Sequence, residues 1–327
     1  MWDFNIGSAF GMMGRTLPFI ILRMAVYFGI AIGYVLVTGT GAGIGYGVGI
    51  VGGPDFQANS TIWGGIIGFG VFGAVMYWAR EYILYIVKAG HIAVLLELMD
   101  GKKLPQGRSQ LTHATTVVKQ RFGQASVLFA IDQLIKGVVK AISGLVRGIL
   151  TVLPIPGAQQ LAGILKAFLS VAVGFVDEVI LAYAIRTQSD NAWMSAKEAL
   201  VLYGQNYKVM LKNAAWLAFI VYGLGFLVFL LMLAPAALIV YLMPGGWTAG
   251  GFIFALLFAW SVKAALLEPF AITCMMQVYF KTIEGQRPDP EWEAKLEQLS
   301  KKFRKLKERA LGSAGESGAA SGVEGTS

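Results

Sequence analysis

The chain has 327 residues, of which 56% are hydrophobic and 14% are charged, and its formal net charge is +8. A soluble domain carries about 25% charged residues, so much of this apolar surface requires the bilayer as its solvent. The composition excludes an ordinary soluble enzyme, a disordered protein and a collagen-like protein, and it disfavours nucleic-acid binding. We expect an integral membrane protein.

Four long apolar runs predict membrane-spanning helices, because a crossing takes roughly 20 apolar residues. The runs cover residues 17–49, 62–87, 214–243 and 250–280. Arg23 lies near one end of the first run, where its side chain can reach the headgroups. The second helix can continue through Met99, and Pro235 predicts a kink in the third. We therefore predict an all-α, polytopic helical membrane protein with four transmembrane helices in two hairpins.

The region between the hairpins contains two further predicted helices. Residues 125–151 carry Asp132, Lys136, Lys140 and Arg147 near one face, which indicates an amphipathic helix. A proline-containing break precedes a second apolar run at residues 160–186. These two central helices are amphipathic at the surface, re-entrant or membrane-spanning. An even number of crossings is required if the two hairpins share an orientation.

Positive charge gathers in the middle of the chain. Residues 101–212 hold thirteen Lys and Arg against five Asp and Glu, whereas the hairpin loops at 51–61 and 244–249 contain no Lys or Arg. The positive-inside rule therefore predicts that these loops face outward and that the middle region and both termini are cytoplasmic. The sequon Asn59-Ser60-Thr61 falls in an outward loop, and the plasma membrane is the favoured location.

The two hairpins resemble each other in sequence, which favours an internal duplication. A shift of 187 residues aligns Ser8 with Ser195 and Glu81 with Glu268. Repeats are common in transporters, whose sites lie at the repeat interface. We predict a first hairpin repeat with its cytoplasmic helix at 1–122, central basic helices at 123–190, a second hairpin repeat at 191–290, a basic cytoplasmic helix at 291–311, and a disordered tail at 312–327.

Glycines are concentrated at the end of the first apolar run. Gly41, Gly45 and Gly49 share one face of a helix, and missing side chains at this spacing allow two backbones to approach closely. This pattern favours tight helix packing or dimerisation. The alternative is a broken segment that lines a cavity.

Ionisable residues within apolar runs are costly and are therefore candidates for function. Glu81 and Glu268 come first, because the repeat gives them equivalent depth. Arg80 can neutralise Glu81, and Lys263 lies five residues before Glu268. An interfacial, structural placement of these residues is the alternative.

Asp177 and Glu178 interrupt the last central apolar run. Two adjacent carboxylates repel each other, so we expect a raised pKa in at least one of them or a nearby cation. The candidate substrate or ion contacts are therefore Glu81, Glu268, Arg80, Lys263, Asp177 and Glu178.

The C-terminal segment combines an apolar seam with a basic cluster. Its apolar residues recur at alternating spacings of four and three, as in a coiled coil, but for under three heptads; they are Trp292, Leu296, Leu299, Phe303, Leu306 and Ala310. We expect this helix to pack on the membrane or on the protein's own cytoplasmic face. Its cluster is suited to anionic lipid headgroups and includes Lys301, Lys302, Arg304 and Lys305.

Residues 180–206 and the two spans that follow resemble the C-terminal part of choline transporter-like membrane proteins. The similar residues are the run Asn191-Ala192-Trp193-Met194-Ser195-Ala196-Lys197-Glu198-Ala199, then Asn206, and the exit Val278-Tyr279-Phe280-Lys281-Thr282-Ile283-Glu284-Gly285. The resemblance covers about a hundred residues. This chain has fewer spans than that family and lacks its large cysteine-bearing outer loop. The resemblance implies transport of choline or a related organic cation.

The sequence shows no catalytic triad, metal cluster, phosphate loop or cofactor fingerprint, so we expect neither enzymatic activity nor a metal or cofactor. The leading hypothesis is a transporter or channel-like protein for a small solute, with Glu81 and Glu268 along its path. The alternative is a non-transporting membrane scaffold or membrane-organising protein that acts through cytoplasmic basic helices. Expected partners are the bilayer, anionic lipid headgroups and a second copy bound through the glycine face or the C-terminal helix.

Overall fold

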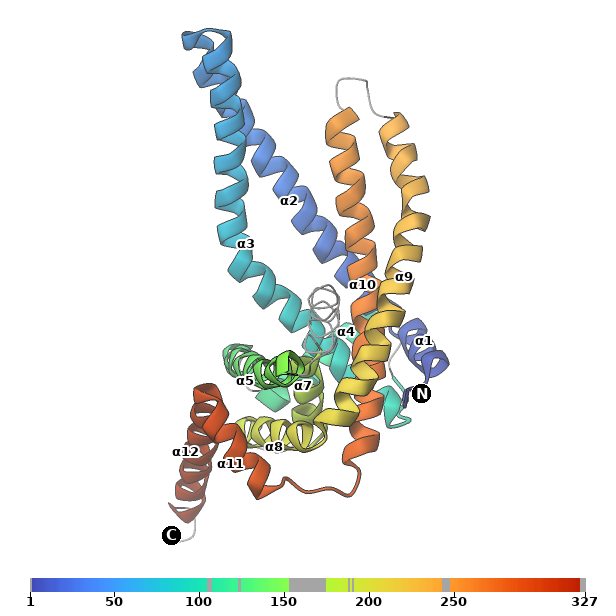
Figure 1. Cartoon of the computed structure of the whole chain (residues 1–327), viewed down its shortest axis with the longest axis vertical. Helices are drawn as coiled ribbons and strands as arrows, with labels where there is room; N and C mark the ends of the chain where they lie inside the picture. The colour runs from blue at the N-terminus through green and yellow to red at the C-terminus, as the bar shows by residue number, and fades with distance from the viewer. Residues whose placement is uncertain are drawn as a thin grey trace. The chain divides into compact units, whose positions relative to one another are not determined.

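The computed structural model describes residues 2–104, 108–122, 125–152, 175–187, 189, 191–242 and 248–323. All regular elements in this part of the chain are helical, so the prediction of an all-α fold is confirmed (Figure 1). The helices are α1 (Ile6–Arg15), α2 (Leu17–Gly49), a 3-10 turn (Ile50–Gly52), α3 (Pro54–Met99), α4 (Arg108–Phe122), α5 (Ala125–Val152), α7 (Val176–Arg186), α8 (Ala192–Gln205), α9 (Tyr207–Leu242), α10 (Thr248–Ile283), α11 (Pro290–Leu299) and α12 (Lys301–Val323).

Five stretches of the described residues are long and apolar enough to cross a membrane, which fits a multi-pass membrane protein. They lie in four helices, α2, α3, α9 and α10, because α3 contains two of them. The outer stretch of α3, Pro54–Tyr77, is almost entirely exposed, whereas more than half of Tyr82–Met99 is buried inside the protein. The inner part of α3 therefore has the burial of a protein core helix rather than of a lipid-facing span.

The first hairpin is closed by a shorter loop than the sequence indicated. We expected a loop at 51–61, but α3 begins at Pro54 and includes the Asn59 sequon. Proline is favoured in the first turn of a helix, and Asp55 there interacts favourably with the helix dipole. Gly53 has a φ of 82°, a left-handed conformation that suits glycine and reverses the chain. The polar residues after Pro54 are thus the first turns of a helix.

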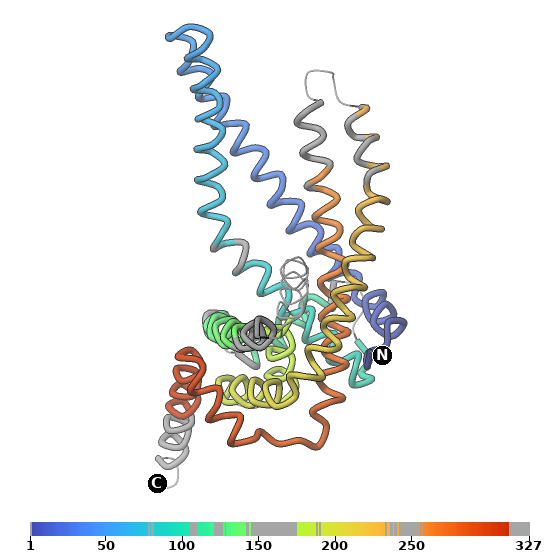
Figure 2. The backbone as a smooth tube through the Cα atoms, viewed as in Figure 1, coloured from blue at the N-terminus to red at the C-terminus, as the bar shows by residue number. Residues whose placement is uncertain are grey.

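The chain divides into two compact units, each made of separate chain segments that can be followed by residue number in Figure 2. We call residues 19–87 with 223–268 the hairpin unit, and residues 1–18, 88–222 and 269–327 the helical unit. Large apolar side chains are exposed along the long helices of the hairpin unit, among them Leu36, Ile44, Trp63 and Ile67. A contiguous exposed apolar surface of this kind is expected where lipid is the solvent.

Glycines bring α2 and α3 into direct backbone contact within the hairpin unit. A Cβ atom on Gly41 would collide with the carbonyl oxygen of Gly64, and one on Gly45 would collide with the carbonyl oxygen of Ser60. Gly49 lies against Gln57 and Ser60 in the same way. This glycine face is therefore covered by α3 of the same chain.

The helical unit has its own apolar core, in which α8 packs against α7, α11, α12 and α5. The C-terminal seam is part of that core, since Leu296, Phe303, Leu306 and Ala310 are all buried. Ser300 has an extended backbone, with φ −138° and ψ 113°, and divides the seam into α11 and α12. We expected this segment to pack either on the membrane or on the protein itself, and its apolar face packs on the protein's own helices.

Two expectations on chain organisation have different outcomes: one lies partly outside the described residues, and the other is wrong for most of its length. The second central run, predicted at 160–186, is described only from residue 175, where α7 follows, so a crossing by its first part lies outside the described residues. The tail from Gly312 was expected to be disordered, but α12 continues to Val323. Extension of an existing helix adds one backbone hydrogen bond for each further residue.

The two hairpins have similar beginnings and ends. Each follows a short helix capped by an asparagine, since the Asn5 side chain accepts from the N–H of Ser8 and that of Asn191 from the N–H of Met194. Each ends at a glycine with positive φ, 74° at Gly101 and 72° at Gly285. With the 187-residue shift, Asn5 lies opposite Ala192 rather than Asn191, and the two glycines align only after a three-residue gap. The duplication itself and its domain boundaries stay a prediction.

Candidate functional site

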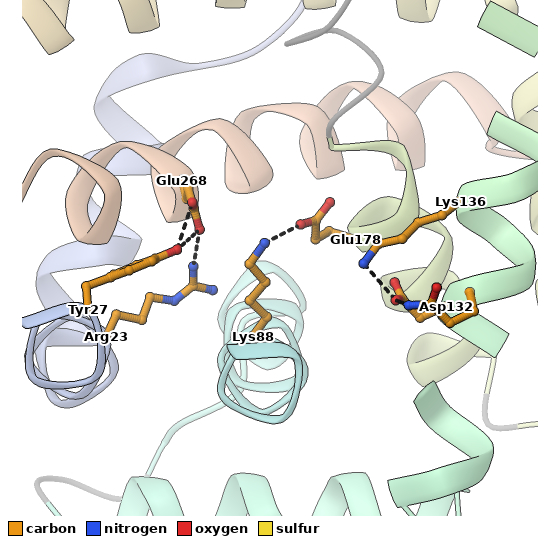
Figure 3. A network of polar contacts seen from close by, with 8 residues as sticks. Arg23, Tyr27, Lys88, Asp132, Lys136, Glu178 and Glu268 are labelled. Carbon is orange, nitrogen blue, oxygen red and sulfur yellow. Dashed lines mark hydrogen bonds and ion pairs between the residues drawn. The ribbon is translucent and has the colours of Figure 1, made fainter. Parts of the chain in front are cut away.

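Glu268 on α10 lies in a polar contact with two residues of α2, inside the hairpin unit (Figure 3). The Tyr27 hydroxyl lies 2.8 Å from both carboxylate oxygens, and Arg23 Nη1 lies 3.4 Å from Oε2. Arg23 and Tyr27 are four residues apart and so share a helix face. The Arg23 side chain is 2% exposed and that of Glu268 is 29% exposed.

This geometry corrects the expectation that Arg23 reaches toward the headgroups. Its guanidinium is buried, because the Glu268 carboxylate offsets part of the cost of removing the charge from water. The Tyr27 ring also packs edge-on against Trp260, with 5.6 Å between centroids. Glu268 is therefore held by two specific partners on another helix of the hairpin unit.

Lys263 takes a different direction from Glu268. It is half-buried, and a Cβ atom on Gly225 of α9 would lie 2.8 Å from Lys263 Cε. Gly225 thus provides room for the lysine stem. Arg80 and Glu81 lie in α3, but their side chains fall outside the described residues, so the role proposed for Glu81 stays a prediction.

A second polar group lies inside the helical unit, where α7 begins (Figure 3). Lys88 Nζ of α3 contacts Glu178 Oε1 at 2.9 Å, and the Glu178 side chain is 4% exposed. Lys136 Nζ contacts the buried Asp132 Oδ2 at 2.9 Å, both on α5. Asp177 and Glu178 occupy the first turn of α7, where acidic residues favour helix formation through the helix dipole.

The two adjacent acids have opposite pKa shifts. Burial, followed by the neighbouring Glu178 charge, raises the pKa of Asp177 well above its ordinary value. Burial alone would also raise the pKa of Glu178, but the Lys88 ammonium and a hydrogen bond from Asp177 outweigh it and lower that pKa. The sequence predicted a raised pKa or a nearby cation, and the arrangement contains both.

The exposed side of α12 presents four cations. Lys301, Lys302, Arg304 and Lys305 are exposed, and the structure gives them no ion pair with any described residue. Their neighbour Lys307 differs, because it contacts Glu293 at 2.9 Å and Glu297 at 2.7 Å. The helical unit thus uses Lys307 internally and leaves four neighbouring cations facing outward.

An open cavity of about 620 Å³ also lies in the helical unit. Arg186 of α7 and Gln277, Phe280 and Lys281 of α10 contribute to its walls. Of the predicted candidate contacts, the four whose side chains are described, Glu268, Lys263, Asp177 and Glu178, do not line it. Among the described residues, no group of three or more His, Cys, Asp or Glu side chains is placed to hold a metal ion.

Comparison with known proteins gives no relative: no protein-family model, curated protein or solved structure matches the chain. The assignment to a multi-pass helical membrane protein therefore depends on the helices themselves.

Sequence reasoning missed Tyr27 and Lys88. Tyr27 lies four residues after Arg23, but a tyrosine in an apolar run is a common interfacial residue and gives no separate signal. Lys88 follows the second apolar run, where a lysine is expected to reach the headgroups. Their partners, Glu268 and Glu178, are 241 and 90 residues away along the chain. No local pattern connects residues so far apart.

Proposed function

We propose that this is a membrane-anchored organising protein whose helical unit binds anionic lipid headgroups through α12. This is the function that the arrangement of charges supports best. The observation that carries it is a contrast on α12: Lys307 is paired with two glutamates, whereas Lys301, Lys302, Arg304 and Lys305 are exposed and have no ion pair with a described residue. Basic clusters of this kind on a membrane-attached helix are attracted to anionic lipid.

The opposite face of α12 supports the proposal. Phe303, Leu306 and Ala310 are buried in the helical unit, so the helix is held in place and its rotation about its axis is fixed. The four cations then point away from the core together. An isolated amphipathic helix would insert its apolar face into the interface; here that face is occupied, and the attraction is electrostatic.

Vesicle capture tests the proposal with the full-length protein in neutral-lipid nanodiscs. We expect capture of vesicles that contain phosphatidylserine and little capture of neutral vesicles. A variant with Lys301, Lys302, Arg304 and Lys305 changed to Gln should lose about three orders of magnitude in affinity at low salt, since each cation contributes about 1 kcal/mol.

The matched control changes four exposed cations elsewhere in the helical unit to Gln: Lys102, Lys103, Lys119 and Lys208. It alters the net charge equally. Equal losses in the two variants would mean that net charge alone acts, and the α12 proposal would be rejected.

A second candidate function is transport of a small solute, for which choline or another organic cation is the proposed substrate class. The supporting observation is the pair between buried Arg23 and partly exposed Glu268 in the hairpin unit, because ionisable residues within membrane spans commonly mark solute or ion pathways. In liposomes, uptake of choline or protons should fall in a Glu268→Gln variant. If liposomes with the wild-type protein take up no more choline or protons than protein-free liposomes, this candidate function is rejected.

A further inference from the structure

A basic surface on α5 adjoins the cations of α12. The side chain of Lys302 lies over Gly137 of α5, since a Cβ atom at Gly137 would be 2.6 Å from Lys302 Cγ and 3.2 Å from its Cβ. The two helices, α5 and α12, pack against each other. Gly137 therefore forms a notch in α5 that holds the aliphatic stem of Lys302.

Lys140 places a further cation beside this notch. It lies three residues after Gly137, so the two share a face of α5, and it is exposed. Lys136 is engaged by Asp132 at 2.9 Å, whereas Lys140 has no ion pair with any residue that the structure describes. On α12, Lys305 lies three residues after Lys302 and is equally exposed.

We propose that Lys140, Lys302 and Lys305 form a two-helix site for a lipid headgroup with clustered phosphates, such as a phosphoinositide. A phosphomonoester carries about −1.5 to −2 charges at pH 7, so a headgroup with two of them concentrates its charge within the reach of several lysines. Phosphatidylserine distributes single charges over many headgroups. Three cations from two packed helices suit the concentrated charge better than the distributed one.

A lipid is the occupant because the helical unit is tied to the membrane through its own helices. Both α9 and α10 extend from the hairpin unit into the helical unit without interruption. This inference rests on the proposed function, since it names the lipid class that the same basic surface prefers. The inference also gives α5 a part in lipid binding. Binding of anionic lipid by α12 alone does not require α5.

The test compares two vesicle compositions of equal net charge, one with phosphatidylinositol bisphosphate and one with phosphatidylserine, against the full-length protein in neutral nanodiscs. We expect the wild-type protein to prefer the bisphosphate vesicles. Lys140→Gln should weaken capture of these vesicles about fivefold, the effect of one surface cation, and should change capture of phosphatidylserine vesicles less than about twofold. Lys302→Gln should weaken capture of both vesicle types.

Lys119→Gln is the matched control, because Lys119 is an exposed lysine on another helix of the same unit. Soluble inositol trisphosphate should compete with the bisphosphate vesicles, which shows that the headgroup is recognised. Equal effects of Lys140→Gln and Lys119→Gln, or equal capture of the two vesicle types by the wild-type protein, would overturn the two-helix site while the α12 proposal stands. Failure to capture either vesicle type would overturn both.

Discussion

At the scale of single residues, two carboxylates of this protein, Glu268 and Glu178, are paired with cations from another helix. Glu268 contacts Arg23 and Tyr27, and Glu178 contacts Lys88. A buried ion pair adds little net stability, but removal of one partner leaves an uncompensated charge in a poorly solvated place. These residues are therefore important for the integrity of each unit, whatever further role they have.

Lys88→Met should destabilise the helical unit by about 3–5 kcal/mol, because it leaves the Glu178 carboxylate buried without its cation. The double variant Lys88→Met/Glu178→Leu should recover most of this loss. Chemical unfolding of the full-length protein in detergent, followed by circular dichroism, measures both. Lys103→Met is the exposed control, with an expected change within about 0.5 kcal/mol. A double variant as unstable as the single one would contradict the pairing.

Asp177 predicts a particular pH dependence of stability. Its pKa is raised in the folded protein, so the folded state binds the proton more tightly than the unfolded chain. The free energy of unfolding should therefore fall as the pH rises above the unfolded pKa of about 3.9. Asp177→Asn removes the ionisable carboxyl and with it this loss of stability, so the variant should be more stable than the wild-type protein at pH 7.5.

The difference between Asp177→Asn and the wild-type protein should shrink as the pH approaches 4, where the wild-type carboxyl is protonated in both states. The melting temperature, measured from pH 4 to 8 in one detergent, gives this curve. A difference that widens toward low pH would show that Asp177 is held as a carboxylate and would contradict the assignment.

At the scale of elements, the α2–α3 hairpin depends on the absence of side chains on one helix face. Gly45 lies against the backbone of α3 at Ser60, whereas a Cβ atom on Gly43 would meet nothing within 4 Å. The two glycines are neighbours in the same helix with opposite surroundings. Substitutions at these two positions therefore separate the effect of disturbing the α2–α3 contact from the effect of replacing a glycine within a helix.

Gly45→Leu should destabilise the hairpin by about 1–3 kcal/mol or more, the range for overpacking, because the backbones of α2 and α3 must separate. Gly43→Leu should be neutral or slightly stabilising, since leucine has the higher helix propensity and projects into open space. Thermal unfolding in detergent compares the two variants. Equal destabilisation by both would rule out the glycine contact as its cause.

Hydropathy predicted the long helices closely, because a run of apolar residues needs only local information. The first predicted run ends with α2 at Gly49, and the second helix continues to Met99 as expected. The start of α3 was wrong by several residues, since Pro54 and Asp55 permit a helix that the polar composition concealed. The seam of the C-terminal segment predicted a packed face, but nothing in its spacing identified α8 and α5 as its partners.

The candidate site was less predictable from sequence, because it depends on contacts between distant residues. Glu268 and Glu178 were recognised by their cost in apolar runs, yet Arg23 was expected at the headgroups and Lys88 was not recognised at all. The basic cluster on α12 could be recognised from the sequence as a run rich in lysine and arginine. Its division into paired and unpaired cations required the positions of Glu293 and Glu297.

At the scale of the whole molecule, the same helices form the membrane anchor and the helical unit. The parts of α9 and α10 in the hairpin unit, residues 223–242 and 248–268, are about 30 Å long at 1.5 Å per residue. This length matches the hydrocarbon core of a bilayer. The rest of each helix belongs to the helical unit, so continuous helices join the membrane spans to the unit that carries the basic surface.

Amine-reactive footprinting of the full-length protein tests the central claim most directly. The protein is placed in nanodiscs of neutral lipid and of lipid containing phosphatidylserine, and acetylation of each lysine is measured by mass spectrometry. We predict that Lys301, Lys302 and Lys305 are protected in the anionic nanodiscs, severalfold at low salt and less at high salt, while Lys103 and Lys119 react equally in both. Equal reactivity of the α12 lysines in the two lipids would contradict the account.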